Sequence, residues 1–300
     1  MAYLVILLSL VVGPPASSQG LRTPEYKEAI TEGLDLLHRL EYDEAFQSFE
    51  ALARAYPDHP GPRLAGAVAI WLRELFERED LDLDRFISSG YFTRAARLDM
   101  SEEARQAFFE RIAEARELAA RYLEDDPGDP DARYYLGACE GALGAFAFTI
   151  DRSLRQAMSH GKKSYEIHRA VVEEYPDFGD SYMTVGTYEY VVSNLPWYIK
   201  WIATIVGYRG SEERAFEYLL RAAEKGYFVK IDARVLLMIL YVREKQYDYA
   251  LEVAHQLHGR FPENFLFHLN QAQILERMER REEAAGVLTE IVRRAESGTK

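Results

Sequence analysis

Residues 238–262, MILYVREKQYDYALEVAHQLHGRFP, contain the spacing that decides the fold, because Met238, Ala250 and Pro262 stand twelve residues apart. The same twelve-residue step recurs in two further sets, Gly33, Ala45 and Pro57, and Ala272 and Ala284. From Ala250 to Ala284 is 34 residues. A fixed period of this size indicates stacked helical hairpins.

A helical hairpin repeat needs a small residue where its two helices cross closely, and another where its second helix meets the next repeat. We call these positions the first and second slots. Six pairs follow one another: Gly33/Ala45, Gly66/Ala115, Gly137/Ser164, Gly186/Ala215, Met238/Ala250 and Ala272/Ala284. From each second slot to the next first slot the steps are 21, 22, 22, 23 and 22 residues. This regularity predicts six consecutive hairpins.

The slot pattern resembles that of the tetratricopeptide repeat family, with its W-x2-L-G-x2-Y, A-x3-F and P positions. The resemblance covers about residues 26–295, and the first and fifth repeats match best. It implies an all-α fold, a right-handed superhelical α-solenoid of about six hairpins. The sequence departs from the family where no Trp fills the Trp position, and where Met238 and Ala272 replace the glycine.

Three of the predicted hairpins carry extra residues between their slots. The excess over twelve is 37 residues in the second hairpin, 15 in the third and 17 in the fourth. In the first insert, Ser101 followed by two glutamates predicts a helix start. The second insert is rich in small residues and lacks proline, so we expect it to lengthen helices. The third insert has an apolar stripe over residues 197–206, which we expect to pack on the concave face.

The N-terminus has the features of a secretory signal peptide. The apolar run 4–12 is too short to span a bilayer, which needs about 20 residues. Pro14 and Pro15 break the run, and Ala16-x-Ser18 forms a small-residue cleavage site. We expect a signal peptide over 1–18, a linker over 19–26 and the solenoid over 27–298. An uncleaved anchor or a wrongly chosen start codon is the alternative.

The composition of the chain indicates its cellular compartment and disfavours some classes of partner. Cys139 is the only cysteine, so the chain forms no internal disulfide, and no N-x-Ser/Thr sequon is present. A bacterial periplasm is the simplest destination. The net charge of -13 opposes binding to a nucleic-acid backbone and disfavours a polybasic grip on anionic lipid. Membrane contact through the third insert is left open but is not favoured.

The motifs of common enzyme classes are missing from the sequence. It has neither G-x-S-x-G nor H-E-x-x-H, and adjacency of Ser159 and His160 is not triad geometry. His255 and His258 share a predicted helix but would need a third ligand to hold a metal. The acidic run 77–84 lacks the order of a calcium loop and predicts a solvated acidic face. We therefore expect no catalytic residue, metal or cofactor.

By resemblance to the family, the first helices of the hairpins line the concave face. The predicted lining, together with the tryptophans of the third insert, comprises Arg63, Trp71, Tyr134, Met183, Tyr190, Trp197 and Trp201. The basic and Asn residues with which family members clamp a peptide carboxylate are absent, apart from Arg63. This apolar groove is either filled by the inserts or open to an apolar ligand or partner helix.

The favoured function is a non-catalytic exported scaffold that binds a protein or peptide. The alternative is a periplasmic carrier or transporter-associated subunit that binds an apolar small molecule in the groove. A membrane-associated adaptor is a third reading.

Overall fold

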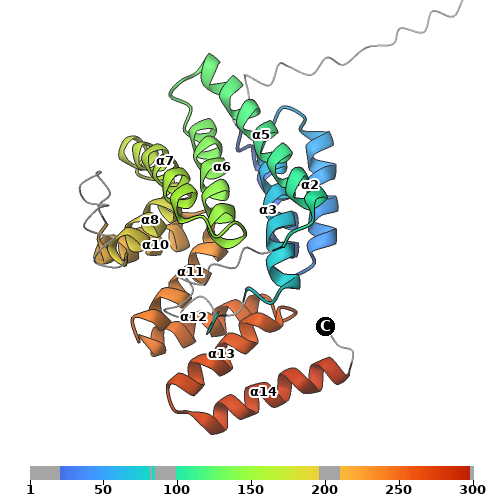
Figure 1. Cartoon of the computed structure of the whole chain (residues 1–300), viewed down its shortest axis with the longest axis vertical. Coiled ribbons are helices and arrows are strands. Elements are labelled where there is room, and N and C mark those ends of the chain that lie inside the picture. The colour runs from blue at the N-terminus through green and yellow to red at the C-terminus, as the bar shows by residue number, and fades with distance from the viewer. Residues whose placement is uncertain (1–20, 82, 85–98, 196–209, 298–300) are drawn as a thin grey trace, which may run out of the picture.

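The computed structural model describes residues 21–81, 83–84, 99–195 and 210–297. Within these ranges all regular structure is helical, and twelve helices follow one another along the chain (Figure 1). Their bounds are α1 Pro24–His38, α2 Tyr42–Ala55, α3 Pro60–Glu77, α5 Glu102–Asp125, α6 Pro130–Thr149, α7 Leu154–Glu174, α8 Ser181–Ser193, α10 Glu212–Lys225, α11 Lys230–Arg243, α12 Tyr247–Arg260, α13 Phe265–Arg277 and α14 Arg281–Glu296.

Each helix packs against the next, so the twelve helices form six antiparallel hairpins. The pairs are α1/α2, α3/α5, α6/α7, α8/α10, α11/α12 and α13/α14. The predicted fold class, an all-α solenoid of six tetratricopeptide-like hairpins, is confirmed. In the described ranges, no helix is both long enough and apolar enough to cross a membrane.

The slot residues lie where the paired helices approach most closely. A Cβ added to Gly137 would come within 2.7 Å of His168, and one added to Gly186 within 2.8 Å of Leu219. Gly33 meets the ring of Phe49 in the same way. Where the second slot is Ser164, its hydroxyl donates a hydrogen bond of 2.7 Å to the carbonyl of the first slot, Gly137. Small residues are needed here because a larger one would separate the helices.

A repeated turn ends the first helix of four hairpins. The residue after the C-cap has a positive φ at Leu40, Glu79, Lys245 and Glu279. At each turn the next N–H donates to the carbonyl five residues earlier, as in the 2.8 Å bond from Gln246 to Tyr241. This is the Schellman arrangement, here built without glycine.

The first two inserts begin and end as helix. Helices α3, α5, α6 and α7 have 18, 24, 20 and 21 residues, whereas the others have 13 to 16. Ser101 caps α5 as expected, accepting a hydrogen bond of 3.1 Å from the Ala104 N–H. The predicted stripe 197–206 lies outside the described residues.

The acidic run is not a fully solvated face, contrary to expectation. Asp80 is buried, and its carboxylate lies 3.5 Å from the Arg152 guanidinium. Leu83 packs into the core formed by α11, α12 and α13. Asp84 pairs with Arg277 of α13 at 2.8 Å. The start of the first insert therefore connects the second hairpin to the last two.

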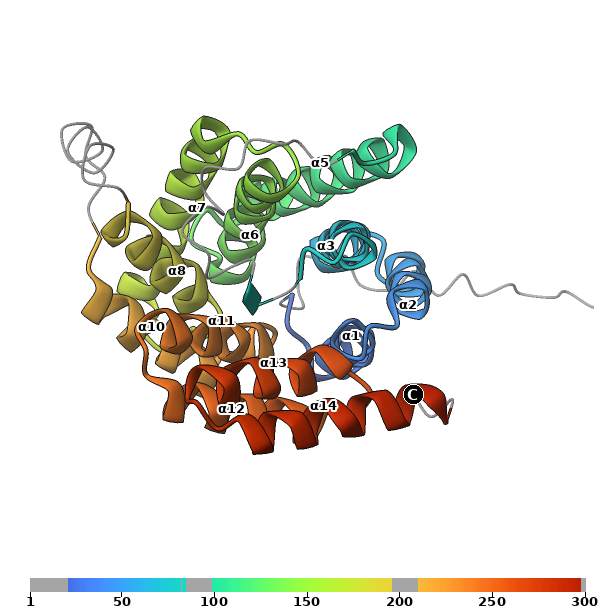
Figure 2. The same cartoon turned by 60° about the horizontal axis from the view of Figure 1, so that its bottom comes forward.

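The array curves until its first hairpin meets its last two, and Figure 2 shows the helices arranged around a ring with α1 beside α13. His38, the last residue of α1, stacks on Phe261 with ring centroids 5.3 Å apart. Its carbonyl accepts a 2.7 Å hydrogen bond from the Asn264 amide, and its Nε2 lies 3.3 Å from Asp232. The concave face is consequently enclosed rather than open along one side.

Candidate functional site

The structure does not bring the predicted groove residues together as an open surface. Tyr134 of α6 and Tyr190 of α8 are buried, and Met183 is partly buried in the core of the fourth hairpin. The Tyr190 hydroxyl donates a 2.7 Å hydrogen bond to Glu244, at the end of α11. These side chains therefore join neighbouring hairpins.

The remaining predicted residues form hydrogen bonds within the chain or lie outside the described ranges. Trp71 of α3 donates a 2.8 Å hydrogen bond to the Thr149 hydroxyl at the end of α6. Arg63 donates to the Ala53 carbonyl at 2.8 Å, on the side of α3 that meets α2. Trp197 and Trp201 lie outside the described residues, so their place near Tyr134 stays a prediction.

The concave face is occupied by the residues just before α1, which we call the N-terminal hook, Leu21–Thr23. The expected linker 19–26 differs from what is found, because α1 begins at Pro24 and both Leu21 and Tyr26 are buried. The Thr23 hydroxyl caps α1, accepting a 3.2 Å hydrogen bond from the Tyr26 N–H. The hook thus enters the centre of the ring and turns directly into the first helix.

The guanidinium of Arg22 lies in a cradle contributed by α6 and by the loops before α8 and α11. Its carbon is 4.8 Å from the ring centre of Tyr134, 4.1 Å from that of Phe178 and 4.7 Å from that of Phe228. Its nitrogens pair with two carboxylates, Asp131 at 2.6 Å and Asp180. Aromatic faces and carboxylates together are well suited to a planar cation. We call the set Asp131, Tyr134, Phe178, Asp180 and Phe228 the cradle.

Asp180 is the main anion of the cradle and also shapes it. Its Oδ1 accepts three backbone hydrogen bonds, from Tyr227 and Phe228 at 2.8 Å and from Val229 at 3.1 Å. The other oxygen pairs with Arg22. The adjacent Gly179 lies directly against the backbone of Lys225, where a side chain would clash. The loop before α11 is in this way drawn toward the guanidinium.

Burial and neighbouring charges shift the pKa values of Arg22 and Asp131 in opposite directions. Burial by itself would lower the pKa of the Arg22 guanidinium, but Asp180, together with weaker contributions from nearby groups, raises that pKa above its ordinary value. Burial raises the pKa of Asp131, and Arg22 offsets only part of this effect. Arg22 therefore remains a cation, and Asp131 is the weaker of its two counter-ions.

The backbone of the hook is held by His59, the N-cap residue of α3. Its Nε2 lies 2.6 Å from the Leu21 carbonyl, and its Nδ1 accepts a 2.9 Å hydrogen bond from the Gly61 N–H. These two partners define a neutral ring that donates from Nε2. Burial lowers the pKa of His59 to about 4, in agreement with the neutral form. The ring also stacks on Tyr26, with centroids 3.7 Å apart.

Sequence reasoning missed this site because its members are far apart in the chain. Arg22 and Asp180 are separated by 158 residues. The available local signal was Thr23-Pro24, a helix start that fixes where the hook must end. Among the predicted groove residues, Tyr134 is the one that belongs to the cradle.

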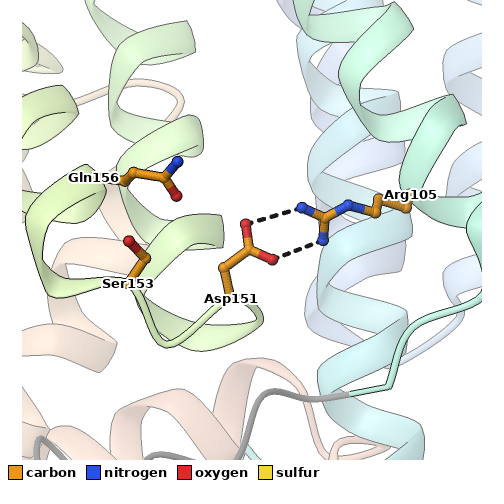
Figure 3. A pocket seen from close by; sticks show the side chains of 4 residues that line it. All are labelled: Arg105, Asp151, Ser153 and Gln156. Atoms are coloured by element: carbon orange, nitrogen blue, oxygen red, sulfur yellow. Dashed lines mark hydrogen bonds and ion pairs between the residues drawn. The ribbon is translucent and has the colours of Figure 1, made fainter.

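A second polar site lies on the surface between α5 and the α6–α7 turn. An open pocket of about 280 Å³ is lined by Arg105, Asp151, Ser153 and Gln156 (Figure 3). The Arg105 guanidinium is paired with both oxygens of Asp151, at 2.7 and 3.0 Å. The cation of this pocket is thus already neutralised by the chain itself.

Cys139 and His258 are both packed against other residues of the chain. Cys139 is buried, which raises its pKa to about 12, so its thiol is not activated. His258 stacks on His268, with ring centroids 4.2 Å apart, between the last two hairpins. Among the described residues no cluster of three His, Cys, Asp or Glu side chains is arranged to hold a metal ion.

Comparison with known proteins identifies no family for this chain. No family model matches the chain, and no curated protein matches it. Among solved structures, yeast Tom70 aligns over 90% of this chain and 76% of its own, with 13% sequence identity and a TM-score of 0.35. The assignment of a tetratricopeptide-like helical repeat therefore rests on the six hairpins and their slot residues.

Proposed function

We propose that this protein is a non-catalytic scaffold, exported to the periplasm, that binds an extended protein segment on its concave face. The observation that carries the proposal is the way the hook is held. His59 binds a backbone carbonyl, the Leu21 side chain is buried, and the cradle surrounds a guanidinium. Backbone, apolar side chain and charge are the three features by which a site recognises a peptide.

The same observation defines the chemistry of the partner. A segment with an apolar residue followed by arginine would reproduce the contacts of Leu21 and Arg22. Lysine would fit less well, because it lacks the planar group that the three rings and two carboxylates surround. The carrier alternative is less well supported, since Tyr134 and Tyr190, on which an apolar ligand was expected to rest, are buried by the chain's own side chains.

The hook must be displaced before a partner can enter. Because it is joined to α1 through Thr23, its effective concentration at the cradle is on the order of millimolar. A partner therefore needs contacts beyond the cradle, or a high local concentration, to replace it. The hook keeps the aromatic residues covered and both carboxylates paired while the site is free of partner.

The test uses a chain whose cradle is empty. The hexapeptide GLRTPE, which has the sequence of residues 20–25, is titrated by calorimetry into the Leu21→Ala/Arg22→Ala variant. We expect binding by this variant, at least tenfold weaker binding of GLQTPE, and none by the wild-type protein, whose hook blocks the site. Circular dichroism checks that the variant is folded.

A second, milder variant is needed in case Leu21→Ala/Arg22→Ala does not fold. Arg22→Lys keeps the charge in the cradle but loses the planar fork, so it should exchange with GLRTPE more readily than the wild type. If neither folded variant binds the peptide, the cradle is a structural joint and the proposal is wrong. An apolar metabolite retained in native mass spectra would support the carrier instead.

A further inference from the structure

The side chain of His38 joins the end of α1 to α11 where the ring closes. Its Nδ1 lies 2.7 Å from the Leu34 carbonyl oxygen, and its Nε2 lies 3.3 Å from the Asp232 carboxylate. Both partners are acceptors only, whereas a neutral imidazole carries a single N–H. Only the imidazolium can donate to both oxygens. Loss of the proton leaves a bare ring nitrogen facing an oxygen at one of the two contacts.

The position of His38 in the fold favours the positive charge. It is the last residue of α1, where the helix dipole attracts a cation. Its ring stacks on that of Phe261, an aromatic surface suited to a cation, with centroids 5.3 Å apart. The side chain is only 11% exposed, so water does not readily replace a hydrogen bond that is lost. The contact with α11 therefore depends on the proton.

The charged groups around His38 come from three elements. Asp35 lies on α1 itself, and Asp232 lies in the first turn of α11. Arg260, at the end of α12, is paired with Asp35 at 3.3 Å. The N-cap residue of α13, Asn264, contributes a neutral amide, which donates to the His38 carbonyl. Carboxylates thus approach the ring from α1 and α11, and the guanidinium from α12 is already paired.

The pKa of His38 is set by burial and by these carboxylates. Burial by itself lowers the pKa, but the Asp232 carboxylate raises it, both by its charge and by its hydrogen bond. The bond to Leu34 and the charge of Asp35 add to this effect, so the pKa of His38 lies above its ordinary value of 6.5. The stability that His38 contributes is therefore complete below pH 6.5 and is lost as the pH rises through the folded pKa.

We propose that His38 is a pH-sensitive latch of the ring, which holds the end of α1 against α11 when protonated and loosens this closure when it loses the proton. Other closing contacts do not titrate, among them the Asn264 bond and the packing of Phe76 on Phe265. Deprotonation therefore loosens the closure without unfolding the chain. The latch consists of contacts within the chain and is independent of the proposed function.

The first test follows the proton itself. The chain has seven histidines, so the NMR signal of His38 is identified by its loss in His38→Asn. In the wild type its titration should have a midpoint above pH 6.5. Asp232→Asn keeps the size of the side chain but removes its charge, so it should lower this midpoint to 6.5 or below. A wild-type midpoint at or below 6.5, or an unchanged midpoint in Asp232→Asn, would overturn the assignment.

The second test measures the closure by amide hydrogen exchange at residues 37–41, the end of α1 and its turn. Wild type and Asp232→Asn are compared at the same pH, because this removes the base catalysis of exchange itself. At pH 6.5 these amides should exchange at least about threefold more slowly in the wild type. The ratio should approach one as the pH rises through the folded pKa of His38. A ratio that does not change with pH would refute the latch.

The matched control is Asp248→Asn. Asp248 is exposed in the first turn of α12, as Asp232 is in the first turn of α11, so the substitution removes the same charge from an equivalent helix position. This variant should keep the wild-type midpoint of His38 and the wild-type exchange at residues 37–41. If it behaves like Asp232→Asn, the effect comes from net charge and the latch is wrong.

Discussion

His59 shows how one buried side chain links the hook to the rest of the ring. Its neutral ring donates to the Leu21 carbonyl and accepts from the Gly61 N–H. A protonated ring would lose the acceptor that caps α3 and would place a cation in a buried site close to Arg22. The local sequence, His59-Pro60, indicates a helix start but not the partner on the other side of the ring.

We predict that acid destabilises the protein partly through His59. Its folded pKa of about 4 lies below the ordinary value of 6.5, so the unfolded chain binds this proton first. The stabilisation is complete above pH 6.5 and is lost as the pH falls toward 4, by about 3 kcal/mol. Urea unfolding of wild type and His59→Asn across this range measures the difference. Equal pH slopes for the two proteins would contradict the assignment.

A second residue-scale prediction concerns the crossing of α8 and α10. In Gly186→Leu the new Cβ would lie 2.8 Å from Leu219 and 3.0 Å from the Ala215 carbonyl oxygen, so backbone must move. We expect a loss of about 1–3 kcal/mol in the free energy of unfolding. Gly259→Ala is the control, because its Cβ meets nothing within 4 Å, and it should stabilise α12 by up to about 1 kcal/mol. A neutral Gly186→Leu would contradict this close crossing.

The turns that end α1, α3, α11 and α13 share one backbone conformation, although the residues that form them differ. All four place a non-glycine residue at positive φ, a conformation that costs about 1–2 kcal/mol for most side chains. The cost is accepted because the turn satisfies the last carbonyls and directs the second helix back along the first. The same backbone turn therefore forms whether or not the slot residues of its hairpin follow the tetratricopeptide pattern.

We predict that glycine at one of these turns stabilises the protein. Lys245 is exposed and has a φ of 59°, so Lys245→Gly relieves the strain without removing a packed side chain. The gain should be up to about 1 kcal/mol, since the greater freedom of glycine in the unfolded chain offsets part of the relief. Arg39→Gly, at the exposed C-cap of α1 with a φ of −87°, is the control and should destabilise. Thermal unfolding distinguishes the two, and a destabilising Lys245→Gly would contradict the argument.

More of the hairpins than of the site could be predicted from the sequence. Gly137 and Gly186 could be recognised because close helix crossings exclude side chains, which leaves a periodic trace in the chain. Met238 fills a slot with a large side chain, and only the interval identified it. The cradle could not be recognised in this way, because Arg22 precedes the first repeat and meets Asp131 and Asp180 only after the solenoid has curved. The buried position of Asp80 was missed for the same reason.

For the whole molecule, we predict that the exported chain begins at Gln19. The apolar run 4–12, its proline break and the Ala16-x-Ser18 pattern motivate this expectation. Only two residues would then precede Leu21, the first residue of the hook. Intact-mass analysis of the periplasmic fraction measures the start of the mature chain. Full-length protein retained in the cytosol would contradict export.

The closure of the ring has a consequence for how the molecule comes apart. An open repeat array frays from its ends, because each repeat contacts only its neighbours. Here the bond from Asn264 to the His38 carbonyl joins residues 226 positions apart, and the hook ties α1 to the middle hairpins. The array has no free first repeat from which to unravel. We expect one cooperative transition, with amides of α1 and α13 exchanging with solvent at similar rates, and a chain without residues 1–22 should lose this coupling.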